Sequence, residues 1–210
     1  MKGLYLLAVS LIASTALADG LSIAITDTRQ GMVGYEDGVF SGPMASRYQC
    51  AIDGLNQAYT VTTFPRTRAL RLLKHHQVDL GLPLARTPIR DTYASFSGAL
   101  FEIEFHLFTQ AAETDTPPDT EQVAVVWTSG VLPLIEELGH EVIPVDNHQV
   151  GVAMVKRGRT QGVVIPGPLV QVMSPDLEGL VGHRFTTMEL GLYVDQNQPE
   201  LLERLVLAII

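Results

Sequence analysis

Cysteine is almost absent from this sequence, which has a single one, Cys50, among 210 residues. An internal disulfide is therefore excluded. Cys50 falls within a helical pattern of apolar residues that runs from Met44 to Leu55, so we expect it to be small, packed and unreactive.

Basic residues are also scarce. The chain has 14 Lys and Arg against 23 Asp and Glu, which gives a formal net charge of −9, and its cations form no cluster. Nucleic acids and anionic membrane surfaces attract clustered Lys and Arg. We therefore expect neither as a partner.

Long apolar runs are missing except at the N-terminus, where Lys2 precedes the run Leu4–Ala13 and Ala16-Leu17-Ala18 follows it. This run is too short for a membrane helix, which needs about 20 apolar residues. A basic start, an apolar stretch and an A-x-A site are typical of a cleaved secretory signal peptide. We expect residues 1–18 to be removed, so that the mature chain begins near Asp19 without a lipid anchor.

Sequence motifs for metal-dependent or nucleophilic catalysis are lacking too. His75 and His76 are adjacent and so lie on different faces of a helix, whereas two ligands of one metal need a shared face. We expect the remaining histidines to lie on the surface: His106, His140, His148 and His183. The sequence contains no HExxH, G-x-S-x-G or phosphate-loop motif. We expect no cofactor, no metal and no enzymatic activity.

Short β-type runs alternate with helical patterns through most of the chain, which favours parallel sheets covered by helices. In the first half the expected strands are 21–26, 58–63 and 78–82, with helices over 42–56 and from Pro65. In the second half the expected strands are 123–127, 141–145 and 162–165, with helices over 131–138, 150–156 and 199–210.

Two further strands and a polar linker divide this pattern into two parts. Phe101–Phe108 alternates apolar and polar residues, as a half-buried strand does. It leads into the polar, Pro-containing segment Ala111–Gln122, and Glu189–Val194 is a second such strand. We expect an α/β fold of two lobes joined by hinge strands, with residues 19–108 and 190–210 in lobe 1 and 109–189 in lobe 2.

The segment Arg86-Thr87-Pro88-Ile89-Arg90 predicts a helix start after a strand, with Thr87 as N-cap and Pro88 at the first helical position. Free backbone N–H groups and the positive end of the helix dipole favour an anion there. Arg90 would reach the same anion, because a guanidinium matches a carboxylate with two parallel hydrogen bonds. The alternative is a surface salt bridge to Asp91 or Glu104.

Four more residues lie where strands end and a cleft is expected. Arg66 and Arg68 lie two apart at a helix start, so they point in different directions. Arg66 is the better candidate for the cleft, and Arg68 for a structural role. Phe64 and Trp127 end strands and are candidates either for ligand contact or for the core.

The chain resembles the periplasmic solute-binding proteins of the polar amino-acid ABC transporter class. Five segments carry the resemblance in order and spacing: Phe64–Leu70, Val78–Gly81, Arg86–Arg90, Phe96–Leu100 and Phe105–Phe108. The resemblance implies the type 2 periplasmic-binding fold. It also implies that Arg90 binds a ligand carboxylate, and that Asp27 and the turn Thr128-Ser129-Gly130 face the ligand, although Ser129 is equally suited to be a plain N-cap.

The sequence departs from this family at two places. Pro83 and Ala85 stand where small hydroxylated residues usually precede the arginine. Pro166 stands where the family has the acidic residue that holds an α-ammonium group. Because a buried ammonium without a carboxylate partner is costly, the sequence favours an organic anion without an amine over a standard α-amino acid.

The resemblance implies a monomeric periplasmic protein that closes on a small polar or anionic solute and presents it to a membrane permease or sensor. One alternative is an accessory or sensory subunit with the same fold. Another is a dehydratase-like enzyme for small acids, in which Asp27, Glu102 or Glu104 would serve as the buried carboxylate. In the family a further strand or helix usually follows at the point where this sequence reaches Ile210.

Overall fold

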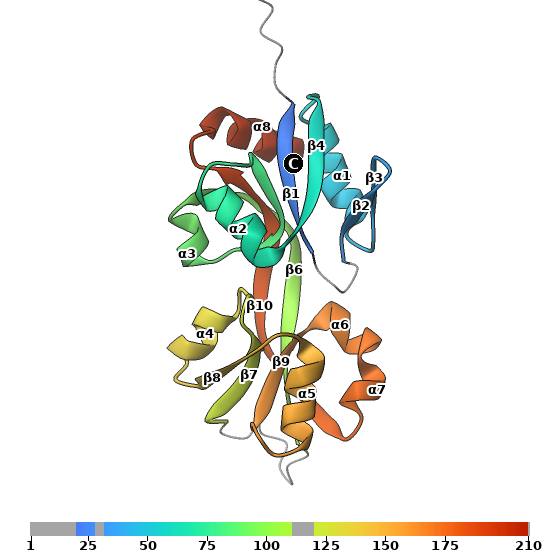
Figure 1. The fold of residues 1–210 in the computed structure, drawn as a ribbon, viewed down its shortest axis with the longest axis vertical. Helices are drawn as coiled ribbons and strands as arrows, with labels where there is room; N and C mark the ends of the chain where they lie inside the picture. Colours follow the sequence, from blue (N-terminus) through green and yellow to red (C-terminus); the bar gives the residue numbers. More distant parts are fainter. Residues whose placement is uncertain (1–19, 28–31, 111–119, 210) are drawn as a thin grey trace, which may run out of the picture.

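The computed structural model describes residues 20–27, 32–110 and 120–209. The expected signal peptide, the turn after Asp27 and most of the expected linker lie outside these residues. Eight strands form one sheet in the order β4-β1-β5-β10-β6-β9-β7-β8. The chain forms two groups of helices and strands, one above the other, which two long strands connect (Figure 1).

The first group is built on β1 (Leu21–Asp27), which pairs in parallel with β4 (Tyr59–Pro65) and β5 (Leu80–Ala85). Alternation along β1 places Ile23 and Ile25 on one face and Ala24 on the other. The isoleucines pack with residues of α1 (Ala45–Asp53) and α8 (Pro199–Ile209), whereas Ala24 packs with residues of α2 (Arg66–Lys74). Helices therefore cover both faces of this half of the sheet.

The second group repeats this arrangement around β7 (Gln122–Val126), which is parallel to β8 (Glu141–Val145) and β9 (Gly162–Pro166). Val123 and Val125 pack on the side of α4 (Leu132–Glu137), and Ala124 packs on the side of α5 (His148–Lys156). Two short helices, α6 (Gly167–Val172) and α7 (Ser174–Leu177), complete this group.

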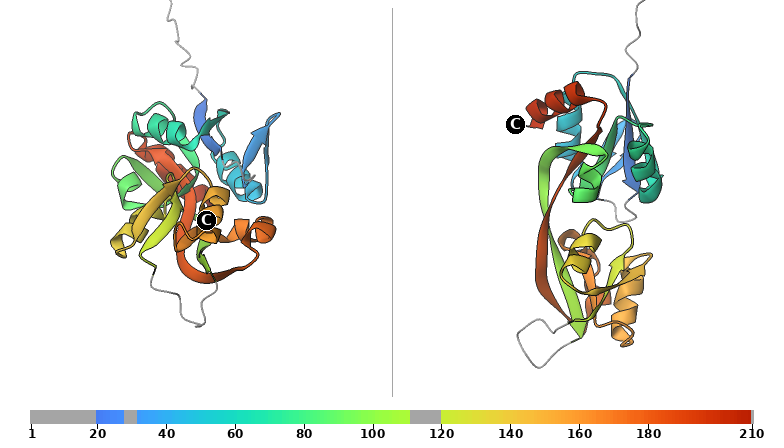
Figure 2. Two further views of the ribbon diagram at one scale, coloured as in Figure 1. Left: turned by 60° about the horizontal axis from the view of Figure 1, so that its bottom comes forward. Right: turned by 90° about the vertical axis from the view of Figure 1, so that its left-hand side faces the viewer.

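The two connecting strands are β6 (Ala94–Gln110) and β10 (Leu180–Asp195), which pair in antiparallel fashion over nearly their whole length. They run side by side through both groups (Figure 2). The sequence-based expectation of short strands over 101–108 and 189–194 was wrong in length, because the pairing of β6 with β10 continues through irregularities in register near Gly191. The predicted assignment of residues to lobes stays a prediction.

Other elements include α3 (Pro88–Asp91), whose start the sequence predicts at Thr87-Pro88. A hairpin of β2 (Gly34–Glu36) and β3 (Val39–Ser41) is also present, and sequence patterns did not indicate it. The expectation that Cys50 is packed is wrong, since its side chain is exposed on α1. The buried face of α1 contains Tyr48, Ala51 and Ile52. Cys50 points away from that face because successive residues of a helix are separated by about 100°.

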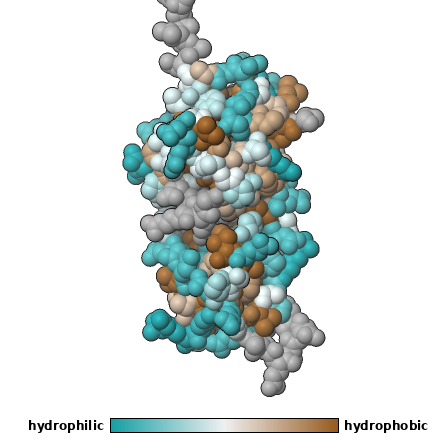
Figure 3. All heavy atoms as spheres, turned by 90° about the vertical axis from the view of Figure 1, so that its right-hand side faces the viewer, coloured by the Kyte–Doolittle hydropathy of each residue, from teal (hydrophilic) through white to brown (hydrophobic). Residues whose placement is uncertain are grey.

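The outer surface mixes hydrophilic residues with small apolar groups, as one face of the molecule shows (Figure 3). Among the described residues, no helix is both long and apolar enough to cross a membrane.

Candidate functional site

A pocket that is partly open to solvent lies between the two groups, with about 80 Å³ of space for the centres of water-sized spheres. Its walls come from the carboxyl ends of the parallel strands and from the turns and helix starts that follow them, where open α/β sheets usually bind ligands. The first group contributes Met32, Arg66, Pro83, Leu84, Ala85 and Arg90. The second group and the two long strands contribute Ile103, Phe105, Val126, Ser129, Gly130, His148, Pro166 and Leu190.

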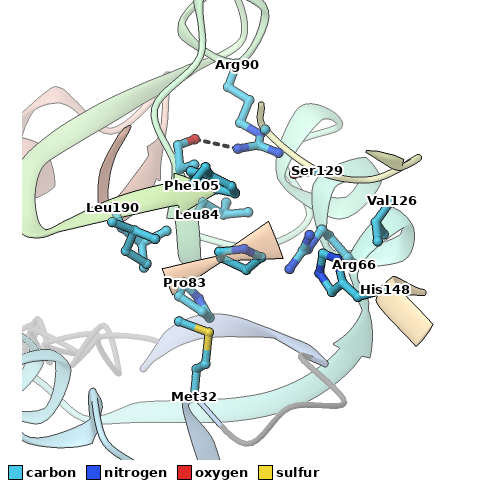
Figure 4. A pocket seen from close by; sticks show the side chains of 14 residues that line it. Met32, Arg66, Pro83, Leu84, Arg90, Phe105, Val126, Ser129, His148 and Leu190 are labelled. Atoms are coloured by element: carbon cyan, nitrogen blue, oxygen red, sulfur yellow. Dashed lines mark hydrogen bonds between the residues drawn. The ribbon is translucent and has the colours of Figure 1, made fainter. Parts of the chain in front are cut away.

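Arg90 reaches the pocket from α3, a helix of only one turn. Thr87 is its N-cap, as predicted, and the Thr87 hydroxyl accepts a hydrogen bond from the Arg90 backbone N–H at 3.3 Å. The Arg90 side chain is 7% exposed, and its guanidinium donates to the backbone carbonyl of Ala85 (Figure 4). The alternative of a surface salt bridge is wrong, because Arg86 and not Arg90 pairs with Asp91.

Tyr193 of β10 holds the start of α3 in place. Its hydroxyl accepts a hydrogen bond from the Thr87 backbone N–H at 3.1 Å and lies 2.7 Å from a carboxylate oxygen of Asp91, to which it donates. Burial raises the pKa of Tyr193 far above its usual value, so it stays a neutral phenol. Nothing in the local sequence pointed to this role, since Tyr193 is about 100 residues from α3 along the chain.

Arg66 enters the pocket as the first residue of α2, directly after Pro65. Its Nη1 donates to the backbone carbonyl of Thr128 in the second group, at 3.4 Å. Burial, and then repulsion from Arg90, lower the pKa of the Arg66 guanidinium to about 10. Arg66 therefore remains charged near neutral pH, although its surroundings disfavour the charge.

His148 is the first residue of α5 and lies beside Arg66 in the pocket (Figure 4). The expectation of a surface histidine is wrong here, because the His148 side chain is 7% exposed. Burial, and then the charge of Arg66, lower the pKa of His148 to about 4. The imidazole is neutral at ordinary pH.

The electrostatic character of the pocket is strongly positive. Burial also lowers the pKa of Arg90, and none of the described pocket residues is acidic. Of the described ion pairs, none involves Arg66 or Arg90. Arg90 is buried and Arg66 is partly buried. Two such guanidinium groups near each other are unfavourable by themselves and become favourable when an anion lies between them.

The second group approaches Arg90 at Gly130. A Cβ atom added to Gly130 would lie 3.0 Å from the Ala85 Cβ and 3.2 Å from Nη1 of Arg90. Ser129 lines the pocket next to it, with its hydroxyl 3.5 Å from the Val131 backbone N–H. A side chain at this position would press on Ala85 and Arg90, so the close approach of the two groups favours a glycine.

Several predicted site residues lie elsewhere. Phe64 packs against the core around α2, with the Arg68 guanidinium 5.0 Å from its ring centroid. Trp127 is 51% exposed and does not line the pocket, so it is neither core nor pocket wall. Thr87 contributes as the cap of α3 and not as a pocket wall. Asp27 ends β1 next to Pro65, but its side chain is outside what the structure describes.

Glu102 and Glu104, the other candidates for a catalytic carboxylate, are exposed on β6 and do not line the pocket. Glu104 instead pairs with Arg184 at 2.9 Å. No group of three or more His, Cys, Asp and Glu suited to a metal ion occurs in the described part of the chain.

Known protein families and curated protein sequences gave no match to this chain. Solved structures do match it. The GluR0 ligand-binding core in complex with L-glutamate superposes with a TM-score of 0.72 at 16% identity, over 92% of this chain and 91% of that one. The periplasmic VFT2 domain of Bordetella pertussis BvgS superposes with a TM-score of 0.71 at 20% identity, over 90% of this chain and 86% of that one.

Truncated, arginine-bound ArgBP from T. maritima superposes with a TM-score of 0.66 at 18% identity, over 90% of this chain and 94% of that one. An ancestral amino-acid-binding protein described as a precursor of cyclohexadienyl dehydratase gives the same TM-score of 0.66 and 18% identity. The fold expected from the sequence is confirmed: this chain has the two-lobed α/β fold of the type 2 periplasmic binding proteins, in a divergent form.

Proposed function

We propose that this chain is exported to the periplasm and binds a small organic anion between its lobes, as the binding component of an ABC-type uptake system. The observation that carries the proposal is the placement of Arg66 and Arg90 in one pocket, both from the first lobe and both without a described carboxylate partner. An anion would neutralise their mutual repulsion and accept charge-assisted hydrogen bonds from both.

The rest of the pocket supports a ligand with a carbon skeleton and no ammonium group. Apolar side chains form most of the wall, among them Leu84, Ile103 and Phe105. Pro166, at the end of β9, provides no charge to hold an ammonium. The proteins with the same fold include ones described with bound L-glutamate and arginine, and we propose that this chain differs from them in excluding the α-amino group.

Closure of the hinge would follow from ligand contacts to both lobes. A ligand held by Arg66 and Arg90 would lie against Ser129 and Gly130 of the second lobe, so it would interact more strongly with the closed state than with the open one. A permease would then recognise the closed form.

A sensory role is the second candidate. The likeness to the VFT2 domain of BvgS favours it. The protein would then bind the anion in the same pocket and signal its presence to a partner protein, and it would not deliver the anion to a transporter. Neighbouring permease and ATPase genes would support uptake, and their absence would support sensing. A dehydratase has less support, since none of the described carboxylates lines the pocket.

A thermal-shift screen of the chain from Asp19 onward, against carboxylic acids, amino acids, polyamines and sugars, tests the proposal. A ligand at about 100 times its dissociation constant adds about 2.7 kcal/mol of stability, which raises Tm by roughly 5–10 °C for a chain of this size. We expect carboxylic acids to give the shifts, and Arg90→Ala to abolish them.

Arg86→Ala is the matched control, because Arg86 lies at the same helix start but is exposed and pairs with Asp91 and Glu189 outside the pocket. Shifts that survive Arg90→Ala, or shifts produced by polyamines or sugars alone, would contradict an anion site.

A further inference from the structure

The side chains that line the pocket are separated by chemical type. The charged and polar ones all follow the carboxyl ends of parallel strands: Arg66, Arg90, Ser129 and His148. Figure 4 shows these four along one side of the pocket, whereas Met32, Pro83 and Leu190 lie across from them. The pocket therefore has a cationic side and an apolar side.

The apolar side is formed mainly by the middle of the sheet. We call it the apolar floor, and its residues are Met32, Pro83, Leu84, Ile103, Phe105 and Leu190. Apart from Met32, they belong to β5, β10 and β6, which are neighbours in the sheet. Ile103 and Phe105 are two residues apart, so their side chains lie on one face of β6. Leu190 pairs with Phe101 and lies on that same face.

A polar group of a ligand would find no partner on the apolar floor. None of the floor side chains is charged or carries an N–H or O–H group. The β10 backbone at Leu190 pairs with Ala85 on one side and with Phe101 on the other. The Pro83 carbonyl already accepts a hydrogen bond from the Thr26 hydroxyl at 3.3 Å. A carboxylate, hydroxyl or ammonium group placed there would lose its hydration without a replacement, which is costly.

We propose that the solute is a short-chain monocarboxylate, with its carboxylate at Arg66 and Arg90 and its hydrocarbon chain on the apolar floor, and that the floor selects against dicarboxylates. This inference rests on the proposed function, since it requires the anion site formed by the two arginines. It adds the chemical class of the ligand and the residues that select its chain.

A single carboxylate is sufficient for the two arginines. Its two oxygens offer about four lone-pair directions, so it can accept hydrogen bonds from both guanidinium groups. Each arginine also donates to a backbone carbonyl, Arg66 to Thr128 and Arg90 to Ala85. The second carboxylate of a linear diacid would lie at the other end of the carbon chain, on the apolar floor, where it would be a buried charge without a partner.

Calorimetric titration at pH 7 with two sets of acids tests the inference. The first set is acetate, propanoate, butanoate and pentanoate, and we expect the affinity to rise roughly threefold with each methylene from acetate to butanoate. The second set is malonate, succinate and glutarate, which match propanoate, butanoate and pentanoate in number of carbons. Each diacid should bind at least tenfold more weakly than its matched monoacid.

Two variants place an amide on the apolar floor. Met32→Gln keeps the length of the side chain, and Leu190→Asn makes a similar change from β10. In each variant the ratio of butanoate affinity to acetate affinity should fall at least threefold. Because the two residues belong to separate segments, misfolding of one variant leaves the other as a test. Met188→Gln, on β10 and outside the pocket lining, is the matched control and should leave this ratio unchanged.

The inference and the proposed function fail in different ways. If monoacids bind in an Arg90-dependent way but chain length brings no gain, or if a diacid binds as tightly as its matched monoacid, the inference is wrong and the anion site stands. A preference for butanoate that both floor variants leave unchanged would also overturn the inference. Binding that survives Arg90→Ala, or no binding of any of the acids, would overturn the proposed function as well.

Discussion

The Nη1 atom of Arg66 donates a hydrogen bond to the backbone carbonyl of Thr128 at 3.4 Å, so a side chain of the first lobe contacts the first turn of the second lobe beyond β7. This contact brings a partly buried positive charge to the boundary between the two groups of helices and strands. Under the proposed hinge motion, opening would separate Arg66 from Thr128, so we expect this contact only in the closed state.

Replacement of Arg66 should weaken ligand binding without lowering the stability of the protein. Arg66→Met removes one of the two guanidinium groups, so we expect carboxylate binding to weaken at least tenfold, about 1.4 kcal/mol. The free energy of unfolding should stay the same or rise by about 1 kcal/mol, because the repulsion between Arg66 and Arg90 disappears. Calorimetric titration and urea unfolding measure the two effects.

Arg68→Met is the matched control for this variant, since Arg68 is exposed on the same helix and stacks on Phe64. It should change the affinity less than twofold. Equal losses of affinity in the two variants would contradict a specific role for Arg66.

Gly130 should be needed for closure. In Gly130→Ala the new methyl group would lie 3.0 Å from the Ala85 Cβ, a tight contact that a small separation of the lobes would relieve. We expect about tenfold weaker binding, equivalent to about 1.4 kcal/mol, with little change in the Tm of the ligand-free protein. Small-angle scattering should show less compaction on addition of ligand, and wild-type compaction and affinity in this variant would contradict the role of Gly130.

Tyr193 should stabilise the helix that carries Arg90. Tyr193→Phe leaves the buried Thr87 backbone N–H without its acceptor, a loss of roughly 1–3 kcal/mol, and Tm should fall by roughly 2–12 °C. Carboxylate binding should weaken as well, because α3 loses an anchor. Tyr59→Phe, whose hydroxyl lies among exposed groups near Asp53, serves as the control, and an equal loss of Tm in both variants would argue against this anchoring.

Stability should depend on pH through His148. The pKa of its imidazole is about 4 in the folded protein and about 6.5 when unfolded. Between these values the unfolded chain binds more protons, so stability rises with pH and is lost as pH falls from about 6.5 to 4. The loss is on the order of 3 kcal/mol, since each pKa unit corresponds to about 1.4 kcal/mol.

Urea unfolding at pH 7 and pH 4.5 of the wild-type protein and of His148→Asn measures this effect. The variant should lose less stability on acidification, because it lacks the titrating group while every other group is retained. An identical pH dependence of the two proteins would show that His148 is not buried in its neutral form.

Local patterns in the sequence were sufficient for most elements of the fold. The sequence predicts a strand over 21–26, and Thr87-Pro88 predicts the start of α3; the structure contains both. The lengths of β6 and β10 were not predictable, because their pairing depends on contacts between residues some 70 to 100 positions apart.

The pocket was predicted in part. Arg66, Arg90, Ser129 and Gly130 line it as expected, since each follows the carboxyl end of a strand. His148 was missed because its burial depends on residues far away in the sequence, which no local periodicity reports. Phe64 and Trp127 also lie at strand ends, yet they do not line the pocket. Position at a strand end therefore indicates the right edge of the sheet but not the direction of a side chain.

A crystal structure of the protein grown with the tightest-binding carboxylic acid from the screen tests the central claim most directly. The account predicts the carboxylate within hydrogen-bonding distance, about 3 Å, of the guanidinium groups of both Arg66 and Arg90, with the second lobe closed over it. A ligand bound at another surface, or held in the cleft without contact to either arginine, would contradict it.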